Sequence, residues 1–566
     1  MLQPIGKILL MAIFSLAFIS CGQQSTTTTT GTDVSRCDKG YTGDNCSSCD
    51  IGYKDNGSGV CSIYQDEPVC AASNGARCLY VAADGNDSAA GSIDAPFKTF
   101  HAAIELANPG DFIYARGGIY GRDNARIVGA HRLPQASFTS PCAEGQVYAD
   151  NYCQVPSLSF VNVGDWNGYP VPDEDGHHIA AGEPGRPITL RNFPGELPIL
   201  DMNALDEGIA DDVKAALIAR QKSAITIGKS HWVIQGLEVI GGSINLWGDI
   251  IDITIEQCHV HDLIRDGGDN PGLIRLNRGP EDVRIINNHL HGIYDHQSPT
   301  EWGASAEDIQ HFGAVTTLSG ETYGGTDDTG KIEIRDNEIY HVPQAFFFKN
   351  AAKGPILITN NHIYDSDRLA SNVSANVSFR GNLVHGVRTG FWRQGMGFAE
   401  KSTLTADELA AVLAIDGHKL TIEYNTIIGL EDTLVASNYG EGHRFSNNVI
   451  FGLPGTATTA GWNTAAFVKV NEGALTPADS RLQTMSSDNN CFIVPDAGFQ
   501  LIARYLPASI LEHYDFAAAQ STFGFDINST FIVSDDPTSV FVNPGAGNYK
   551  LVDTSGCGAV GHTALP

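Results

Sequence analysis

The stretch Val283–His291, which reads Val-Arg-Ile-Ile-Asn-Asn-His-Leu-His, is one copy of a short unit that recurs along the middle of the chain. The preceding copy is Ile253–His261, Ile-Thr-Ile-Glu-Gln-Cys-His-Val-His. In both copies apolar residues alternate with polar ones, a polar pair interrupts them, and the alternation resumes. This pattern predicts two short β-strands joined by a turn. Further copies are Ile332–Tyr340, Ile356–Tyr364, Val377–His385, Leu420–Ile428 and His443–Phe451.

The spacing of the copies indicates the architecture. The steps between the aligned turn residues are 30, 49, 24, 21, 43 and 23 residues. A period of 21 to 24 residues fits one coil of a parallel β-helix, whereas a leucine-rich repeat needs a Leu pattern and a helical segment that are absent here. The two longest steps contain either a divergent coil or a long loop. We therefore predict an all-β fold, a right-handed parallel β-helix solenoid, over residues 79–566.

The turn residue of each copy is Asn, apart from Cys258 in the first. Asn suits a turn because it tolerates left-handed backbone angles. Stacked from coil to coil, the Asn amides can also satisfy one another by hydrogen bonding. We predict a structural Asn ladder, with Cys258 as a buried, unpaired thiol in the same position.

The start of the predicted solenoid has its own signature. A strand at Leu79–Asp87, apolar residues at helical spacing over Pro96–Leu106, Pro109-Gly110-Asp111 and a strand at Phe112–Gly118 resemble the N-terminal cap of secreted β-helix proteins. The helix would cover the open end of the solenoid. From Leu79 onward the chain resembles the pectin-lyase-like β-helix superfamily, of the polysaccharide-lyase type. That fold hosts lyases, hydrolases, epimerases and non-enzymatic adhesins, so the resemblance implies the fold more than the substrate.

The residues before the solenoid predict export. Lys7 and the apolar run Ile8–Ile19 have the proportions of a signal peptide, and Phe18–Cys21 resembles a bacterial lipobox. We expect residues 1–21 to be a lipoprotein signal, with Cys21 lipidated and the protein held at the outer membrane or cell surface by the lipid anchor only. An ordinary signal peptide cut nearby is the alternative. Residues 22–36 then form a Ser/Thr-rich linker.

Residues 37–78 are rich in cysteine. Gly40–Cys46 resembles the Gly-Tyr-x-Gly turn of EGF-like modules, and an exported chain keeps its disulfides. A zinc site is less favoured because this stretch has no His. The cysteines expected in disulfides are Cys37, Cys46, Cys49, Cys61, Cys70 and Cys78 in this module, and Cys142, Cys153, Cys491 and Cys557 in the solenoid. Cys142 could pair with Cys153, and Cys491 with Cys557.

Charge limits the partners. The formal net charge is −30, from 65 acidic and 35 basic residues. This balance argues against nucleic acid as a partner. An acidic polysaccharide would need a local basic site or a bridging cation, and a surplus of carboxylates suits Ca²⁺. We expect the chain to act as a monomer.

The best candidate for a basic site is formed by Lys349 and Arg393. Phe346–Asn350 and Gly390–Gln394 follow the Asn337 and Asn382 turns, and one gap aligns Lys349 with Arg393. Two coils would separate them by roughly 10 Å on one face. The pair resembles the Lys and Arg of β-helix polysaccharide lyases, although 44 residues separate them here and about one coil separates them there. Exposed strand residues without a catalytic role are the alternative.

The resemblance implies β-elimination at a uronic acid unit. Lys349 would act as base, Arg393 would bind the sugar carboxylate, and His296 is an acid/base candidate near a long loop. Trp302 and Trp392 could stack on sugar rings. Asp266, Asp269 and Asp295 lie in an acidic cluster that could bind Ca²⁺.

Other readings remain open. Paired carboxylates would support a glycoside hydrolase on the same fold, and the EGF-like module suits a non-catalytic glycan-binding or adhesion protein. His261, His291 and His385 share an aligned position that Tyr340 and Tyr364 occupy in other coils, which favours a stacked structural column over a metal site.

Overall fold

The structure is a computed structural model. It describes residues 41–42, 48–49, 53–55, 61–63, 76–134, 152–163, 181–204, 223–265, 272–295, 312–318, 330–348, 354–371, 376–394, 419–430, 433–437, 442–452, 466–471, 481–506 and 510–564. Five predicted site residues lie outside these ranges: Asp266, Asp269, His296, Trp302 and Lys349. No helix in these ranges is long and apolar enough to cross a membrane.

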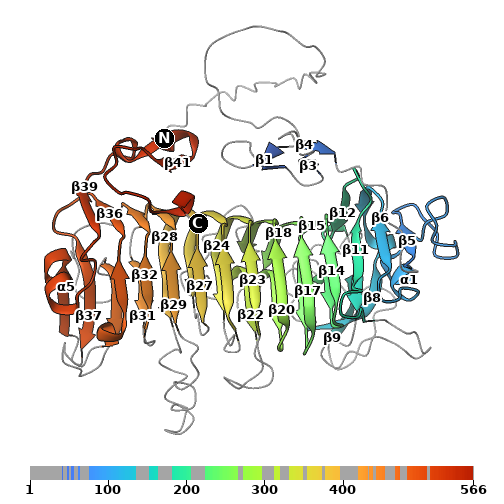
Figure 1. Cartoon of the computed structure of the whole chain (residues 1–566). Helices are drawn as coiled ribbons and strands as arrows, with labels where there is room; N and C mark the ends of the chain where they lie inside the picture. Colours follow the sequence, from blue (N-terminus) through green and yellow to red (C-terminus); the bar gives the residue numbers. More distant parts are fainter. Residues whose placement is uncertain are drawn as a thin grey trace, which may run out of the picture.

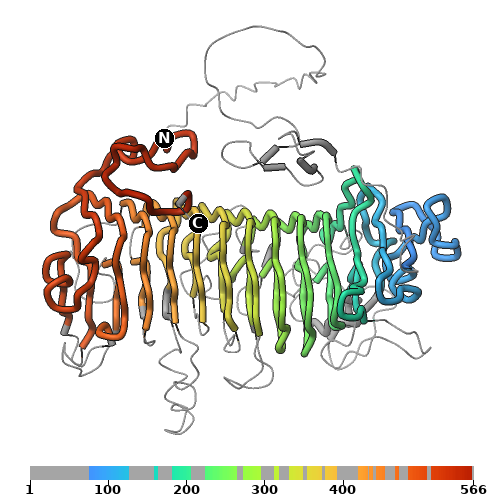
Figure 2. The backbone as a smooth tube through the Cα atoms, in the orientation of Figure 1, coloured from blue at the N-terminus to red at the C-terminus, as the bar shows by residue number. Residues whose placement is uncertain are grey.

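The chain winds into a parallel β-helix whose coils lie side by side from β5 to β37 (Figure 1). The smooth backbone trace shows successive coils stacked in chain order (Figure 2). Each coil contributes strands to three ladders, which we name the first, second and third ladder in the order in which the chain passes through them. The prediction of a mostly β, parallel β-helix solenoid is therefore confirmed.

The first ladder is a 12-stranded sheet whose strands precede the Asn turns. It consists of β5 (Cys78–Val81), β6 (Phe112–Ala115), β11 (Ile188–Asn192), β14 (Trp232–Gln235), β17 (Ile251–Glu256), β20 (Glu281–Ile286), β23 (Ile332–Arg335), β25 (Ile356–Thr359), β27 (Val377–Arg380), β29 (Leu420–Glu423), β32 (Arg444–Ser446) and β35 (Ser486–Asp488). Buried residues alternate with partly exposed ones in most of these strands, as in β23, β25 and β27. This alternation is the period-2 pattern of the repeat.

The second ladder follows the Asn turns. It consists of β7 (Gly118–Tyr120), β12 (Pro198–Asp201), β15 (Glu238–Ile240), β18 (His259–Arg265), β21 (His289–Asp295), the first parts of β24 (Glu338–Phe348), β26 (His362–Ser371) and β28 (Leu383–Gln394), then β30 (Thr426–Ile428), β33 (Val449–Phe451), β36 (Cys491–Val494) and β39 (Thr530–Val533).

The third ladder closes each coil. It consists of β10 (Val161–Val163), β13 (Ser223–Ile227), β16 (Ser243–Trp247), β19 (Gly272–Asn277), β22 (Gly313–Leu318), the second parts of β24, β26 and β28, then β31 (Thr433–Ser437), β34 (Ala466–Asn471) and β37 (Gln500–Leu506). Because β24, β26 and β28 run through both ladders, the second and third ladders form one sheet, which β38 (Ile510–Asp515) extends to 21 strands by pairing antiparallel with β37. One continuous apolar core fills the interior, including Ile285, Leu290 and Val315.

The Asn ladder is confirmed. From Cys258 to Asn448, each backbone N–H donates to the side-chain oxygen of the ladder Asn in the next coil, at 2.8 to 3.0 Å. All ladder residues are buried, and the series continues to Asn490. Cys258 is a free, buried thiol, as predicted. Burial raises its pKa to about 12, so it is not a reactive thiolate.

The left-handed residue of the turn is not the ladder Asn, which corrects the expectation above. It is the residue before: Gln257, Asn287, Asp336, Asn360, Gly381, Tyr424, Asn447 and Asn489 have φ between 53° and 65°. This preceding residue turns the chain from the first ladder into the second, and the ladder Asn directs its amide inward. The ladder position therefore selects Asn for its hydrogen bonds and not for its backbone angles.

The N-terminal end carries helix α1 (Phe100–Ile104), shorter than the predicted Pro96–Leu106. Its N-cap is Thr99, whose hydroxyl accepts from the Ala102 N–H. Buried Phe100, Ala103 and Ile104 join the core beside β5 and β6. An antiparallel pair, β8 (Arg126–Pro134) and β9 (Tyr152–Ser159), follows in the chain. Cys142 and the side chain of Cys153 lie outside the described residues.

Before the solenoid, only four short strands are described. They form two antiparallel pairs, β1 (Tyr41–Thr42) with β2 (Ser48–Cys49) and β3 (Tyr53–Asp55) with β4 (Cys61–Ile63). Cys78 is disulfide-bonded. The other cysteine side chains of the predicted EGF-like module, the linker and the signal segment with Cys21 lie outside the described residues, so those predictions remain untested.

The C-terminal segment folds back onto the second ladder. After β38 (Ile510–Asp515), α5 (Phe516–Phe523) and β39, the chain forms the pair β40 (Phe541–Asn543) and β41 (Asn548–Leu551). The Tyr549 ring lies 5.1 Å from the His385 ring, and His562 Nδ1 lies 2.7 Å from Thr426 Oγ1. The predicted disulfide Cys491–Cys557 joins this segment to β36.

Candidate functional site

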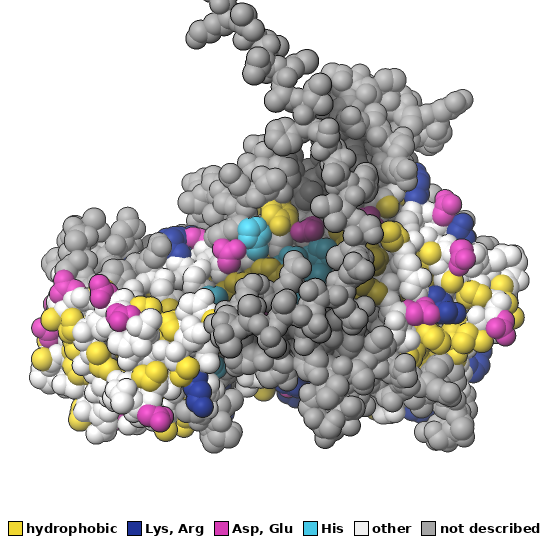
Figure 3. Space-filling model, turned by 90° about the horizontal axis from the view of Figure 1, so that it is seen from above, with side chains coloured by type: hydrophobic (Ala, Val, Ile, Leu, Met, Phe, Trp, Pro, Cys, Tyr) yellow, Lys and Arg dark blue, Asp and Glu magenta, His cyan; other side chains and the backbone are white. Residues whose placement is uncertain are grey.

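The outer face of the second ladder carries two rows of polar and aromatic side chains. In the first row, successive register partners from coil to coil are Glu238, His259, His289, Glu338 and His362. In the second row, they are His261, His291, Tyr340, Tyr364 and His385. The residues between the rows, such as Val260 and Leu290, belong to the core. Strand alternation therefore directs both rows away from the core. Figure 3 looks onto this face and shows histidine and acidic side chains near its centre.

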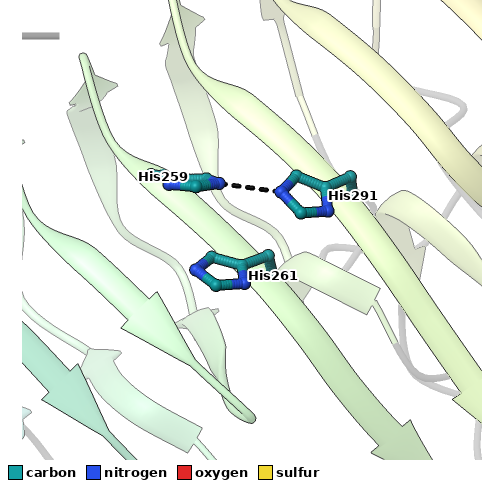
Figure 4. A group of neighbouring side chains, drawn as sticks. All are labelled: His259, His261 and His291. Atoms are coloured by element: carbon teal, nitrogen blue, oxygen red, sulfur yellow. Dashed lines mark hydrogen bonds between the residues drawn. The ribbon is translucent and has the colours of Figure 1, made fainter. Parts of the chain in front are cut away.

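Three imidazoles converge where β18 and β21 are adjacent. One nitrogen each of His259, His261 and His291 lies within 4.8 Å of the others. His259 Nε2 lies 2.8 Å from His291 Nε2 (Figure 4). His259 and His261 share a face because they are two residues apart on one strand, and His291 is the register partner of His261 on the next.

Two carboxylates hold the ring of His261. Its Nδ1 lies 2.9 Å from Asp262 Oδ2, and its Nε2 lies 3.2 Å from Glu238 Oε1. Burial opposes protonation of His261, but its hydrogen bonds to Asp262 and Glu238 outweigh burial and raise its pKa to about 9. Burial, with the neighbouring charge of His261, lowers the pKa of His259 to about 3 and that of His291 to about 4. At neutral pH, a protonated His261 thus lies beside neutral His259 and His291.

The second row also forms the stacked column that the sequence predicts. Successive ring centroids from His261 through His291, Tyr340, Tyr364 and His385 are 4.9, 4.5, 4.8 and 5.1 Å apart, with interplanar angles of 16° or less. Stacked rings at these distances stabilise the ladder by packing.

A second constellation repeats the first, with one substitution. His362 Nε2 lies 2.9 Å from His385 Nε2. Tyr364 occupies the place of His261, and its hydroxyl donates to Glu338 Oε1 at 2.9 Å, as Glu238 contacts His261 in the first. The sequence signal is the parallel between His259-Val260-His261-Asp262 and His362-Ile363-Tyr364-Asp365. Sequence reasoning noted the column, but it did not identify Glu238 or the convergence of the three rings.

The predicted basic site falls on the third ladder. Register aligns Phe347, Ser371 and Trp392 across β24, β26 and β28, so the strands that lead to Lys349 and Arg393 are two apart, as predicted. Arg393 is an extra residue in the pairing of β28 with β31, because Trp392 pairs with Ala436 and Gln394 with Ser437. Lys349 and the side chains of Trp392 and Arg393 lie outside the described residues. Their roles remain predictions.

The same row contains cations that sequence reasoning missed. Arg275 pairs in register with Thr316, which pairs with Phe347, and Ala436 pairs with Lys469. Arg275 lies between the core residues Ile274 and Leu276, and Lys469 between Val468 and Val470, so both alternate away from the core. Both are buried and engaged in interactions.

The remaining predicted residues are separated from this row or not described. Asp295 ends β21 in register with Arg265, and its side chain lies outside the described residues. Asp266, Asp269, His296 and Trp302 are not described at all. The structure therefore does not test the Ca²⁺ site or the acid/base role of His296.

Comparison with known proteins agrees with the fold. Residues 79–326 match a family model described as Pel9A-like, right handed beta helix region. A stretch of 42 residues is 50% identical to the pectate lyase PEL9 of Emericella nidulans, and it is 7% of this chain and 10% of that protein. The match thus spans about a tenth of the curated relative's length.

Two solved structures are similar in outline. The crystal structure of pectate lyase Pel9A has a TM-score of 0.43 and 15% identity, over 73% of this chain and 79% of that one. A rhamnogalacturonan lyase has a TM-score of 0.34 and 13% identity, over 86% of this chain and 100% of that one.

Proposed function

We propose that this protein is a polysaccharide lyase that cleaves an acidic, uronic-acid-containing polysaccharide by β-elimination. The observation that carries the proposal is the match of residues 79–326 to the Pel9A-like family model, together with the short stretch that is 50% identical to a pectate lyase. The matched region ends before Lys349 and Arg393. It therefore supports the class of enzyme and not the assignment of these two residues.

The third ladder offers a geometry for this chemistry. Because only β26 lies between β24 and β28, the ends of these strands are about 10 Å apart at normal strand spacing. We place Lys349 and Arg393 at these ends. An overall charge of −30 repels a polyanion, so binding depends on such a local concentration of cations.

In the proposed reaction, the Arg393 guanidinium binds the sugar carboxylate in a bidentate fork. Neutralising that carboxylate acidifies the C–H on the adjoining carbon. Lys349 removes this proton, a carbon–carbon double bond forms, and the glycosidic oxygen leaves with a proton that His296 supplies. Trp302 and Trp392 stack on sugar rings to either side.

We propose Ca²⁺ as a cofactor held by Asp266, Asp269 and Asp295. Carboxylate oxygens are the ligands that Ca²⁺ prefers. A bound Ca²⁺ would help to neutralise the substrate carboxylate. Stripping divalent ions is expected to lower activity, and Ca²⁺ alone is expected to restore it.

We also propose that Cys21 is lipidated, so that the enzyme sits on the outer membrane or cell surface as a monomer, with the EGF-like module as a spacer. A Cys21→Ser variant should leave the membrane fraction.

The test is an assay of the purified protein on pectate, alginate, chondroitin and ulvan. A lyase produces an unsaturated sugar end that absorbs ultraviolet light, a hydrolase produces reducing ends without that absorbance, and a binding protein produces neither. Lys349→Ala should abolish the absorbance, while Lys331→Ala, which removes an exposed lysine paired with Asp282 near the first ladder, should not. Reducing ends without absorbance would disprove the lyase proposal, and full activity in Lys349→Ala would disprove the assignment of the base.

A further inference from the structure

The three imidazoles lie on the second ladder, whereas the strand parts that lead to Lys349 and Arg393 belong to the third ladder. His259 and His261 lie on β18 and His291 lies on β21. Both strands precede β24 and β28, which lead to the proposed lyase residues. Their ring nitrogens converge within 4.8 Å. The proposed lyase chemistry uses none of them.

The contacts of His261 need a positive centre. Both of its ring nitrogens face carboxylate oxygens, Asp262 at 2.9 Å and Glu238 at 3.2 Å. A neutral imidazole has one N–H and one lone pair, so one of these contacts would set a lone pair against a carboxylate. Either a second proton on the ring or a metal ion at Nε2 removes that repulsion.

The distances fit a metal ion. With Zn–N bonds of about 2.0–2.1 Å, two ligand atoms of a tetrahedral site are about 3.3 Å apart. Glu238 Oε1 and His261 Nε2 are 3.2 Å apart, and the Nε2 atoms of His259 and His291 are 2.8 Å apart. The ligand nitrogen of His261 lies within 4.8 Å of those of the other two histidines, so the side chains must turn to bring all three nitrogens to tetrahedral separations.

We propose that His259, His261 and His291 bind one divalent transition-metal ion of the Zn²⁺ type on the outer face of the second ladder. Three imidazoles suit Zn²⁺, whereas Ca²⁺ takes oxygen ligands. The site is distinct from the proposed Ca²⁺ site in ligands and in metal.

The surroundings hold the ligands in place. Asp262 accepts the Nδ1–H of His261, which leaves Nε2 free for the metal, the usual role of a carboxylate behind a histidine ligand. The ring of Tyr340 stacks on His291 at 4.5 Å, and Val260 and Leu290 anchor the two strands in the core. The ligand directions are thus set by the solenoid itself, because strand register determines them.

The test is direct metal binding by the full-length protein. After treatment with a chelator, the protein is titrated with Zn²⁺ by calorimetry, and Co²⁺ is added to a second sample as a spectroscopic probe. We expect one strongly bound ion per chain and the visible absorption of tetrahedral Co²⁺. His261→Tyr should lose both signals, and it should still fold because Tyr occupies this position in β24 and β26.

The matched control is His362→Leu in the second constellation, where Leu383 occupies the same row one coil on. This variant should bind Zn²⁺ as the wild type does. Weak binding shared equally by the wild type and His261→Tyr would show that only scattered carboxylates bind the metal, and would overturn the proposal, leaving a doubly protonated His261 as the explanation. No substrate enters the test, so its outcome is independent of the lyase proposal.

Discussion

The Nε2 atom of His259 lies 2.8 Å from the Nε2 atom of His291, although 32 residues separate them in the chain. The same relationship recurs between His362 and His385, at 2.9 Å and 23 residues. Both pairs arise because a residue in the first row of one coil meets a residue in the second row of the next. The two constellations differ at the third corner, which is His261 in one and Tyr364 in the other.

Replacing Tyr364 with histidine should create a second metal site. In Tyr364→His, His362 and His385 gain the third imidazole, and Glu338 takes the place of Glu238. Zn²⁺ calorimetry should rise from one ion per chain to two. Adding His385→Ala to this variant should return the value to one. A value of one in Tyr364→His itself would mean that this set of ligands does not suffice for binding.

Removing the carboxylate behind His261 should weaken the metal site without abolishing it. Asp262→Asn keeps the shape of the side chain but loses the charge that holds the Nδ1–H. Loss of such a partner lowers metal affinity by about 10- to 100-fold. Asp365→Asn is the control, because Asp365 is the counterpart of Asp262 in the second constellation and contacts His341, which is not a proposed ligand, at 2.9 Å. Equal affinities in the two variants would contradict this role of Asp262.

Removing one residue of the Asn ladder should destabilise the solenoid. The Asn361 side chain accepts from the Asn337 N–H at 3.0 Å and donates to the Ile334 carbonyl at 3.0 Å, and both partners are buried. Asn361→Ala leaves them unpaired, at a cost of ~3 kcal/mol in the free energy of unfolding. Denaturant titration measures this cost. Asn360→Gly, at an exposed neighbour with φ of 57°, should change the stability by less than ~1 kcal/mol.

The C-terminal segment should loosen as the pH falls. Burial, with a smaller effect from nearby His362, lowers the pKa of His562 from 6.5 to about 4 in the docked state. Below about pH 6.5, His562 is protonated when the segment is undocked, whereas in the docked state it stays neutral down to about pH 4. Docking is therefore fully stable above about pH 6.5 and loses stability as the pH falls toward 4.

Hydrogen exchange of residues 548–564 at pH 7 and pH 5, corrected for intrinsic rates, measures this loosening. The His562→Asn variant can keep a hydrogen bond to Thr426 but cannot be protonated, so its pH dependence should be smaller. His385, whose pKa burial also lowers to about 4, adds a contribution in the same range that the variant retains. An unchanged pH profile in His562→Asn would exclude His562 as the titrating group.

The local pattern was sufficient to predict the coil. Alternation around Asn288 and its counterparts determines which residues face the core, and the ladder and the free Cys258 follow from it. The disulfide Cys491–Cys557 was predicted separately, from the cysteines of an exported chain. The aromatic column was also predictable, because His291 and Tyr340 stand at the same distance after the ladder residue. Even so, the left-handed turn residue was misplaced by one position, since alternation does not show which residue of a polar pair has the left-handed backbone angle.

What depends on neighbours in space was not predictable in the same way. Glu238 reaches His261, and Arg275 joins a row with Phe347 and Lys469, through register across connections of variable length. Sequence alone determined the repeating coil, because its signal is local and recurs seven times. Only the tertiary structure decided which side chains of different coils meet, because that depends on how each long connection returns the chain to the stack.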